Sequence, residues 1–428
     1  MNKAEDGVIV IGAGVAGLAA AQALRAAGVP VTVLEAAPRI GGRARTERPA
    51  VLGGAIFDHG ASWLHAAERN PLVPLAQQNG IALIDSDAER QPLLFIEGRA
   101  AIADELAAYD AAWAATDRLT PPEPDTTLLA LLDPADPWTP TIAHWEGAII
   151  AAADADTLSA RDWKLNALDG TNLSVPGGLG TLVTQLLTGP VQRETPALEV
   201  RWDGPGVQID TPRGTLRAAA CIVTVSTGVL AAGALRFTPA LPVPVQDALY
   251  GLPMGLLSKV ALPGTADTPL NASLVRRLGR GEAGMNFIVR DGHVLGFMGG
   301  RTAWSLAGDT AAAEAFARAE LARMLPSALT HGAVVTRWGT DPWSRGAYAY
   351  ARPGHATARS VLAEASLAGR VVFAGEATRT DGLAGTVGGA YLSGQDAARR
   401  VARLTGGTRD RVRKGTPLYG ATENGLSS

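Results

Sequence analysis

The sequence predicts an α/β fold in which one domain is assembled from separated segments of the chain and a second, α+β domain is inserted into it. Residues 7–35 predict a strand, a helix and a second strand: GVIVIG, an alanine- and leucine-rich stretch that ends at Gly28, and PVTVLE. A strand that is apolar throughout is typical of a parallel sheet covered on both faces. The strand-to-helix pattern returns at residues 371–404, whereas the composition between the two ends is different.

The composition predicts a large folded core and excludes several classes of protein. Of the 428 residues, 47% are hydrophobic and 18% are charged, which excludes wholesale disorder. The 38 lysines and arginines nearly balance the 41 aspartates and glutamates, for a net charge of −3, which argues against a nucleic-acid-binding protein. The length favours two or three domains rather than one.

Cys221 is the single cysteine, so the sequence predicts neither an internal disulfide nor a cysteine-based metal cluster, and no metal site is expected. It lies within the apolar, β-like run AACIVTV, which predicts a buried, unreactive thiol. No run of 18 apolar residues occurs, and MNKAEDG leads into the first strand without the pattern of a secretory signal. We therefore expect no membrane span and a cytoplasmic location.

Further elements follow from periodicity and turn residues. We expect the first domain to comprise residues 1–75, 178–250 and 365–405, and the second to comprise residues 76–177 and 251–364. Helices are predicted over 104–119, 156–170, 175–187 (after a turn) and 310–325. Strands are predicted over 197–202, 207–211, 215–225, 256–262, 285–289 and 293–299. Residues 406–428 lack apolar periodicity and predict an irregular tail, whose RDRVRK cluster is typical of solvated surface.

A glycine pattern joins the first strand to the first helix. Gly12, Gly14 and Gly17 form G-x-G-x-x-G, in which the glycines permit a tight turn, a close approach of the backbone to a pyrophosphate, and close packing of helix on strand. Glu35 ends the second strand, where a carboxylate can accept both hydrogen bonds of an adenosine ribose. The pattern predicts a bound dinucleotide. The acid disfavours the 2′-phosphate of NADP, which leaves FAD and NAD.

Two basic residues stand out from their surroundings. Arg43 follows two glycines in RIGGRART, where its guanidinium can pair with a pyrophosphate in bidentate fashion, with a surface arginine as the alternative. Lys259 lies in the apolar strand LLSKVAL, and burying a lysine is costly unless its pKa falls or it finds partners. Position alone leaves a snorkelling lysine at a sheet edge as the alternative.

Six blocks of the chain resemble, in the same order, the flavin amine oxidase family, which includes the monoamine oxidases, the polyamine oxidases and the flavin-dependent histone lysine demethylases. The blocks are VIVIGAGVAGLAAAQAL, LEAAPRIGGRART, DHGASWLH, LLSKVAL, RWGTDPWSRGAYAYARPG and VVFAGEATRTDGLAGTVGGAYLSGQDAA. The resemblance covers most of residues 7–405, and GASWLH, WGTDP and GAYLSG are most similar to the polyamine oxidase branch. It implies a Rossmann-like FAD-binding domain of the GR2 type with an inserted α+β substrate-binding domain.

The resemblance implies that the dinucleotide is FAD. It places Glu376 against the sugar-like chain of the flavin, and the helix start after Gly385 under the ring system, where N–H groups and the helix dipole stabilise negative charge on a reduced flavin. Ala347 stands where the monoamine oxidases carry the cysteine that bonds the flavin, so we expect non-covalent FAD. The expected cofactor-binding residues are Gly12, Gly14, Ala16, Gly17, Glu35, Ala36, Gly42, Arg43, Gly60, Ala61, Ser62, Trp63, Ala197, Gly375, Glu376, Gly385, Thr386 and Val387.

The resemblance also assigns residues to the substrate side of the flavin. It implies that Lys259 hydrogen-bonds a water beside flavin N5. Trp338 and Tyr348 match positions that form an aromatic wall over the flavin. Thr386 stands where the monoamine oxidases carry a second cage tyrosine, which favours a wider tunnel of the polyamine or demethylase type.

Two further residues are candidates for contact with the substrate. His65 falls where some polyamine oxidases have a substrate-facing acid or histidine. A neutral imidazole there can accept a hydrogen bond from a substrate ammonium and help to keep the reacting nitrogen unprotonated, with a histidine satisfied within its loop as the alternative. Asp169 can pair with a distal ammonium, although an Asp-Gly at a helix end is also ordinary turn chemistry.

The activity implied by the resemblance is that of an FAD-dependent polyamine oxidase acting on spermine, spermidine or an acetylated relative. A hydride equivalent passes from the amine α-carbon to flavin N5, the imine is hydrolysed to an aldehyde, and O₂ reoxidises the flavin to give H₂O₂. The alternatives are oxidation of another primary amine or an L-amino acid, and a non-amine desaturase or isomerase. Histone demethylation is disfavoured because the long helical insertion of that branch is missing. The expected partners are a small amine and O₂, with no nucleic acid and no membrane.

Overall fold

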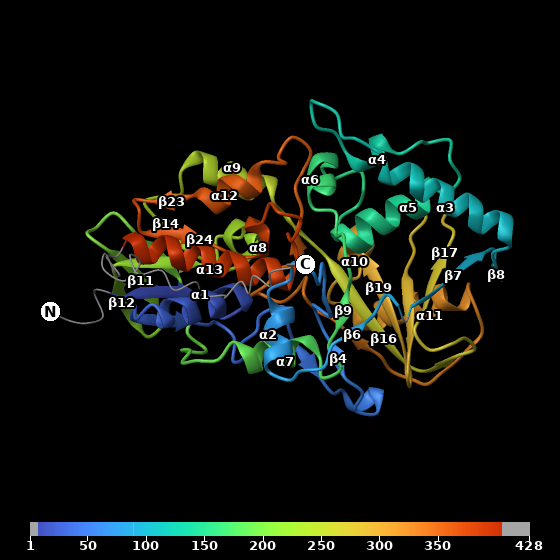
Figure 1. The fold of residues 1–428 in the computed structure, drawn as a ribbon, viewed down its shortest axis with the longest axis horizontal. Coiled ribbons are helices and arrows are strands. Elements are labelled where there is room, and N and C mark those ends of the chain that lie inside the picture. The colour runs from blue at the N-terminus through green and yellow to red at the C-terminus, as the bar shows by residue number, and fades with distance from the viewer. Residues whose placement is uncertain (1–6, 89, 405–428) are drawn as a thin grey trace, which may run out of the picture.

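The computed structural model describes residues 7–88 and 90–404. The chain forms two halves that lie side by side, one around a five-stranded sheet and the other around an eight-stranded sheet (Figure 1). Segments from the start, middle and end of the chain share the five-stranded sheet, which confirms the predicted α/β class. The domain boundaries remain a prediction. The predicted tail, 406–428, lies outside the described residues.

The five-stranded sheet assembles strands that are far apart in sequence. Its order is β2 (Val31–Leu34), β1 (Val8–Ile11), β13 (Ala220–Val223), β24 (Val371–Phe373) and β23 (Ser366–Leu367). The first four strands are parallel, so that Val8 lies between Val31 and Ala220, while β23 is antiparallel to β24. Alternate residues point to opposite faces, so Val10 packs on one side of the sheet and Ile9 on the other. The all-apolar strand is therefore buried on both faces, as predicted.

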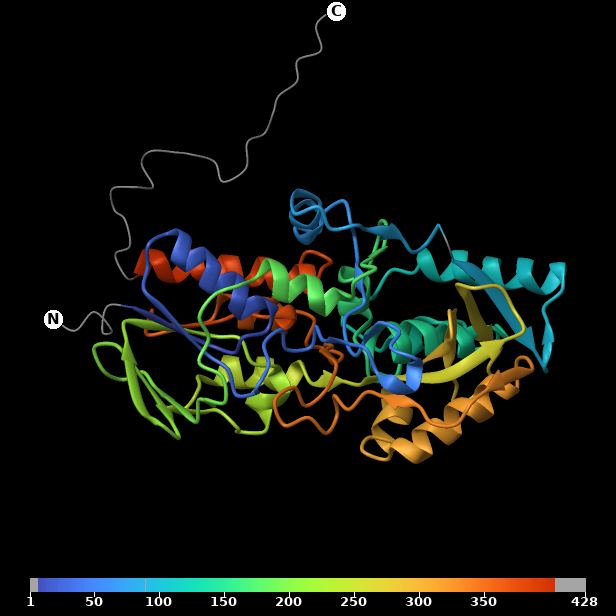
Figure 2. The same cartoon turned by 90° about the horizontal axis from the view of Figure 1, so that it is seen from below.

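Two different layers cover this sheet. One face carries α1 (Val15–Ala26), α2 (Leu72–Gln78), α7 (Leu179–Leu186) and α13 (Val387–Leu404). Figure 1 and Figure 2 both show α1 and α13 side by side. The other face carries α8 (Thr227–Ala231), α9 (Val243–Gly251), α12 (Ala358–Glu364) and a four-stranded sheet of β12 (Gly214–Ala218), β11 (Val207–Thr211), β10 (Glu199–Arg201) and β14 (Arg236–Thr238). Cys221, on β13, is buried beneath this second layer, as predicted, and burial raises the pKa of its thiol.

The eight-stranded sheet forms the second half. Its order is β20 (Ser327–Leu329), β16 (Leu257–Ala266), β19 (His293–Gly299), β18 (Asn286–Arg290), β17 (Ala272–Arg276), β7 (Gln91–Ile96) and β8 (Arg99–Ala100), with β21 (Val334–Val335) also paired to β16. One face packs against α10 (Gly300–Ser305) and α11 (Thr310–Ala322). The opposite face meets α3 (Ala103–Asp117), α5 (Thr139–Ala143) and η2 (His144–Ala151), a π-helix. π-Helices are rare and are frequent at functional sites. The presence of η2 therefore makes this face of the sheet a candidate location for the functional site.

Short elements connect the two halves. They are β3 (Thr46–Glu47), η1 (Ala50–Leu52), β4 (Phe57–Asp58), β5 (Trp63–Leu64), β6 (Ile84–Asp85), α4 (Leu128–Leu131), α6 (Ala160–Leu165), β9 (Leu173–Ser174), β15 (Met254–Gly255), β22 (Tyr348–Ala349) and η3 (Glu376–Thr378). Strand β22 pairs with β15, which immediately precedes β16. This pairing ties Tyr348 to the start of the strand that carries Lys259.

Two sequence predictions are wrong in detail. The run 215–225 was expected to be one strand, but it divides at Ala219 into β12 and β13, which belong to different sheets. The helix expected over 156–170 is confined to α6, because the Ser159 hydroxyl accepts a hydrogen bond from Asp162 N and starts the helix there. Among the described helices, none has the length and hydrophobicity needed to cross a membrane.

Candidate active site

The glycine turn between β1 and α1 is shaped for a phosphate. Gly12 has φ +104°, which favours glycine, and a Cβ on Gly17 would lie 1.9 Å from the Gly12 carbonyl oxygen. The N-cap of α1 is Gly14, whose missing side chain leaves the first N–H groups of the helix uncapped. Such a helix start offers N–H donors and positive dipole to an anion. The turn therefore has the geometry expected for a pyrophosphate.

Glu35 is fixed at the end of β2 with its carboxylate beside this turn. Its Oε2 accepts a hydrogen bond from Ala13 N at 2.7 Å, and its Oε1 accepts one from Ala37 N at 2.8 Å. The residue is only 9% exposed, and burial raises the pKa of its carboxyl against the effect of these two bonds. Each oxygen keeps a second lone pair, so the carboxylate can still accept two ribose hydroxyls. This role stays a prediction.

Arg43 and Glu376 form an ion pair, and the pyrophosphate contact expected for Arg43 stays a prediction. Arg43 Nη1 donates to Glu376 Oε1 at 2.8 Å and to the Ala347 carbonyl oxygen at 2.8 Å. Glu376 Oε1 also accepts from Ala349 N at 3.2 Å. The other carboxylate oxygen, Oε2, is buried and has no partner among the described residues.

Glu376 Oε2, which is buried without a partner among the described residues, shows whether the site suits FAD. Leaving a buried acceptor unsatisfied costs about 1–3 kcal/mol, so native structures rarely tolerate it. A hydroxyl of the flavin's sugar-like chain is a donor of the required kind, and it is the group expected against Glu376. The uncapped start of α1, the carboxylate of Glu35 and this oxygen all suit FAD. When bound, FAD would be held by Gly14, Glu35 and Glu376.

The remaining predicted cofactor residues lie near these groups or in the adjoining core. Gly375 has φ +141°, and a Cβ on Gly385 would lie 3.6 Å from the ring of Tyr348. The Thr386 hydroxyl donates to the Leu383 carbonyl oxygen at 2.7 Å and accepts from Gly389 N at 3.0 Å, so it closes the start of α13. Both hydrogen bonds of the Thr386 hydroxyl are thus explained by its position at the helix start. Its expected contact with cofactor or substrate stays a prediction. Core or partly buried positions are taken by Ala16, Ala36, Gly42, Gly60, Ala61, Ser62, Ala197 and Val387.

Lys259 is buried on β16, 3% exposed, and its ammonium is fully engaged by one segment. Nζ donates to the carbonyl oxygens of Asp58 at 2.9 Å and Gly60 at 2.5 Å, and to Ser62 Oγ at 2.5 Å. The rings of Trp63 and Phe297 lie 5.7 and 5.9 Å away. Burial lowers the pKa of Lys259 to about 8, with Asp58 opposing the shift. An ammonium has three N–H donors, and all three are already used in these hydrogen bonds. The expected hydrogen bond to a water beside flavin N5 would have to replace one of them, so it stays a prediction.

His65 is oriented by two residues that the sequence analysis did not select. Its Nδ1 lies 2.6 Å from Asn172 Oδ1, and Asn172 Nδ2 donates to Asp87 Oδ2 at 2.7 Å. Because the bond to Asp87 fixes the amide, Asn172 Oδ1 must accept from His65 Nδ1–H, which leaves Nε2 as an acceptor. Burial lowers the pKa of His65, which favours the neutral ring. The Trp63 and His65 ring centroids are 6.1 Å apart.

The two aromatic candidates occupy different surroundings. Tyr348 OH donates to the Ile149 carbonyl oxygen of η2 at 3.1 Å, and burial raises the pKa of the phenol. Trp338 Nε1 donates to the His59 carbonyl oxygen at 2.9 Å, and its ring is buried against the α11 side of the large sheet. Among ring contacts of the described residues, none joins Trp338 to Tyr348. The expected aromatic wall over the flavin does not require the two rings to touch each other, and it stays a prediction.

Asp169 lies on the surface rather than within this group. Its carboxylate is well exposed and receives Arg69 Nη2 at 2.6 Å. Asn172 and Asp87 could not be selected from the sequence, because neither belongs to a motif and their link to His65 spans about a hundred residues of chain. The same holds for Asp162 and Arg359, a buried pair described below.

Comparison with known proteins gives the family. The model of the family described as flavin containing amine oxidoreductase matches residues 15–130 and 132–402. Polyamine oxidase 2 of Arabidopsis thaliana is 30% identical over 93% of this chain and 88% of its own length, and polyamine oxidase 4 of Oryza sativa subsp. japonica is 29% identical over 91% and 87%. Lysine-specific histone demethylase 1 homolog 2 of Arabidopsis thaliana is 30% identical over 97% of this chain but only 61% of its own length.

A solved structure has the same fold. It is a putrescine oxidase double mutant from a redesign of cofactor binding, 20% identical, with a TM-score of 0.74 over 93% of this chain and 99% of the other. The likeness confirms the fold class, and the family match confirms the resemblance seen in the sequence and its expected cofactor, FAD. This chain belongs to the flavin-containing amine oxidoreductases and is an FAD-dependent amine oxidase.

Proposed function

We propose that this enzyme is a polyamine oxidase that takes spermidine, spermine or an acetylated derivative. The observation that carries the proposal is His65, a neutral imidazole held through Nδ1 by Asn172, with Nε2 left as an acceptor beside the ring of Trp63. A neutral acceptor suits an amine that must bind with its reacting nitrogen uncharged, and a nearby aromatic ring can enclose the apolar part of such an amine. The likeness to plant polyamine oxidases at 29–30% identity supports the same substrate class.

Held by Gly14, Glu35 and Glu376, FAD would supply the redox chemistry, which is acceptance of a hydride equivalent from the amine α-carbon and reoxidation by O₂ with release of H₂O₂. The chain's own residues position the substrate. His65 Nε2 accepts an N–H of the substrate and holds the reacting nitrogen neutral. Lys259 fixes residues 58–62 through three hydrogen bonds, and the rings of Trp63 and Tyr348 help to exclude water. The resulting imine is hydrolysed by water to an aldehyde and a shorter amine.

The proposal includes non-covalent FAD and a cytoplasmic location. Position 347 is alanine, which has no thiol to bond a flavin, and its carbonyl oxygen is bound by Arg43. Acid precipitation of the purified yellow protein should leave the flavin in the supernatant. A yellow pellet would contradict the non-covalent assignment. Fractionation of the source cells tests the location.

The substrate is tested by anaerobic mixing of the yellow protein with spermine, spermidine, N-acetylated spermidine, putrescine, tyramine and an L-amino acid, while the flavin absorbance is followed. We expect a polyamine to bleach the flavin and air to restore the colour with release of H₂O₂. Bleaching by tyramine or the amino acid alone would replace the proposed substrate with another primary amine or amino acid. No bleaching by any of these compounds, with FAD present, would reject the polyamine oxidase assignment.

A further inference from the structure

A buried ion pair joins two segments that are 197 residues apart. Asp162 lies on α6 and Arg359 on α12, and each residue is 3% exposed. Arg359 Nε donates to Asp162 Oδ1 at 2.7 Å, and Nη2 donates to Oδ2 at 2.9 Å, a bidentate geometry. Figure 1 shows α12 in the half around the five-stranded sheet and α6 in the upper part of the molecule, near the junction of the two halves. The pair therefore ties this half to one of the connecting elements.

The other hydrogen bonds of this pair go to backbone atoms beside the cofactor residues. Arg359 Nη2 also donates to the Ala349 carbonyl oxygen at 2.9 Å, and Nη1 donates to that of Ala377 at 3.3 Å. Asp162 Oδ2 accepts from Ala351 N at 3.1 Å. Ala349 follows Tyr348 and Ala377 follows Glu376 in the chain. The pair therefore holds each segment at the residue that directly follows a predicted site residue.

A second set of hydrogen bonds, centred on Arg43 and Glu376, holds the same segment. Arg43 donates to Glu376 and to the Ala347 carbonyl oxygen, and Ala349 N donates to Glu376. Tyr348 is therefore flanked by hydrogen bonds at the residue before it and at the residue after it, while its own hydroxyl reaches η2. Loss of the Arg359 bonds would release the carbonyl oxygens of Ala349 and Ala377 together.

Stability alone does not explain this arrangement. Burying two charges is expensive, and a buried ion pair usually adds little net stability compared with apolar residues of the same volume. Here each charge also holds backbone atoms of the segments that carry Tyr348 and Glu376. We propose that Asp162 and Arg359 are positioning residues of the oxidase, which set Tyr348 and Glu376 in register against the bound FAD. The catalytic part of this inference rests on the proposed function.

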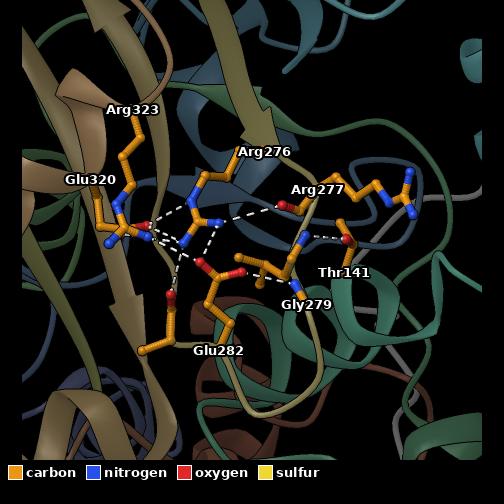
Figure 3. A network of polar contacts seen from close by, with 9 residues as sticks. Thr141, Arg276, Arg277, Gly279, Glu282, Glu320 and Arg323 are labelled. Atoms are coloured by element: carbon orange, nitrogen blue, oxygen red, sulfur yellow. Dashed lines mark hydrogen bonds and ion pairs between the residues drawn. The ribbon is translucent and has the colours of Figure 1, made fainter. Parts of the chain in front are cut away.

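The large sheet provides a matched control. Arg276 Nε donates to Glu320 Oε2 at 3.0 Å, and Glu320 is only 2% exposed (Figure 3). Glu282 and Arg323 complete this cluster, which lies between β17 and α11 and, among the described residues, makes no hydrogen bond to Tyr348 or Glu376. Asp162→Asn and Glu320→Gln each remove one buried negative charge while keeping the shape of the side chain.

The experiment measures FAD affinity, the visible circular dichroism of bound flavin, and the rate of anaerobic flavin reduction at saturating FAD by whichever amine bleaches the wild type. We expect Asp162→Asn to weaken FAD binding about tenfold, to change the flavin circular dichroism, and to slow reduction tenfold to about a hundredfold. Glu320→Gln should lower the melting temperature and leave all three readouts within twofold. Arg359→Lys, which keeps the charge but loses the bidentate fork, should fall between wild type and Asp162→Asn.

The result that would overturn the proposal is an Asp162→Asn enzyme that loses stability as Glu320→Gln does, with wild-type FAD affinity, dichroism and reduction rate. If Asp162→Asn does not fold, the milder Arg359→Lys enzyme decides the same question, and wild-type readouts there reject the proposal. Failure of the wild type to oxidise any amine would reject the polyamine assignment instead. In that case FAD affinity and flavin dichroism still test the pair, because neither readout needs a substrate.

Discussion

The two halves of the molecule each bury a cluster of arginines and carboxylates, but the clusters differ in whether every oxygen of the buried glutamate has a partner. In the eight-stranded half, Arg276 donates to both oxygens of Glu320 and to the carbonyl oxygens of Arg277 and Ala283, and it pairs with Glu282 (Figure 3). In the flavin half, Arg43 and Arg359 likewise donate to carboxylates and to backbone carbonyl oxygens, but Glu376 keeps one buried oxygen without a partner among the described residues.

This difference separates a structural cluster from one prepared for a ligand. Both oxygens of Glu320 are satisfied within the protein, so nothing further is needed to complete that cluster. Glu376 is incomplete without a donor, and the missing donor matches the hydroxyls of the flavin's sugar-like chain. Buried charge by itself therefore does not identify a site. An unsatisfied atom within buried charge does, because the free-energy cost is recovered only when the ligand binds.

The largest effect is expected from Lys259→Met. The change removes the ammonium that holds residues 58–62, so we expect anaerobic flavin reduction to slow by about 10²-fold or more. Lys164→Met is the control, because Lys164 also lies over a tryptophan ring and donates to a carbonyl oxygen, but on the surface. A wild-type reduction rate in Lys259→Met would remove this lysine from the oxidase site.

The next effect concerns FAD retention in Glu35→Ala. The variant leaves Ala13 N and Ala37 N unpaired and removes the predicted ribose acceptor. We expect FAD binding to weaken by about 2 kcal/mol, or roughly 30-fold, as measured by titration of the apoprotein with FAD. Glu194→Ala, at an exposed acid whose backbone N–H donates to the Ala37 carbonyl oxygen, should bind FAD normally. Full flavin occupancy of Glu35→Ala at limiting FAD would contradict the assignment.

A comparison of Glu376→Gln with Glu320→Gln tests the difference between the two clusters directly. We expect about tenfold weaker FAD binding in Glu376→Gln, because the amide is a poorer acceptor and a poorer partner for Arg43. Glu320→Gln should instead lower the melting temperature with unchanged FAD affinity, because breaking a buried pair is destabilising. Equal effects of both variants on FAD affinity would show that the unpartnered oxygen does not mark the site.

The smallest effect is a shift in pH dependence. Burial lowers the pKa of His65, so its neutral, accepting form persists into mildly acid solution, and kcat/KM should fall only when the ring gains a proton. The hydrogen bond that His65 donates to Asn172 Oδ1 raises that pKa in opposition to burial, so Asn172→Ala should move the acid limb to lower pH. The same depressed pKa means that His65 contributes stability above the ordinary histidine range, which is lost as the pH falls. An unmoved acid limb would exclude His65 as the titrating group.

Lys259 adds a second pH dependence, of stability rather than of activity, in alkaline solution. Its pKa of about 8 lies below the ordinary value of 10.5, so the unfolded chain binds more protons between these two values and stability should rise with pH across that window. Thermal unfolding of wild type and Lys259→Met between pH 7 and 10 measures this contribution. The variant should lose the rise, and a rise of equal size in both proteins would assign it to another group.

The sequence by itself determined the features that depend on neighbouring residues. The glycine turn at Gly12 and Gly17 constrains only a short stretch of backbone, so the spacing of the glycines was enough to locate it. The apolar run of β1 likewise predicted a strand that is buried on both faces. The family resemblance, carried by contiguous blocks, is local in the same sense. The division of residues 215–225 between two sheets escaped this reading, because strand propensity does not say which sheet a strand will join.

Only the tertiary structure decided the connections across the chain. Lys259 meets the carbonyl oxygens of residues 58 and 60, His65 meets Asn172, and Arg359 meets Asp162 over about one hundred to two hundred residues. These contacts depend on which elements pack against each other, and no local pattern carries that information. The polar atoms of a buried site must find partners in three dimensions, so the partners come from whichever segments the packed core brings within hydrogen-bonding distance.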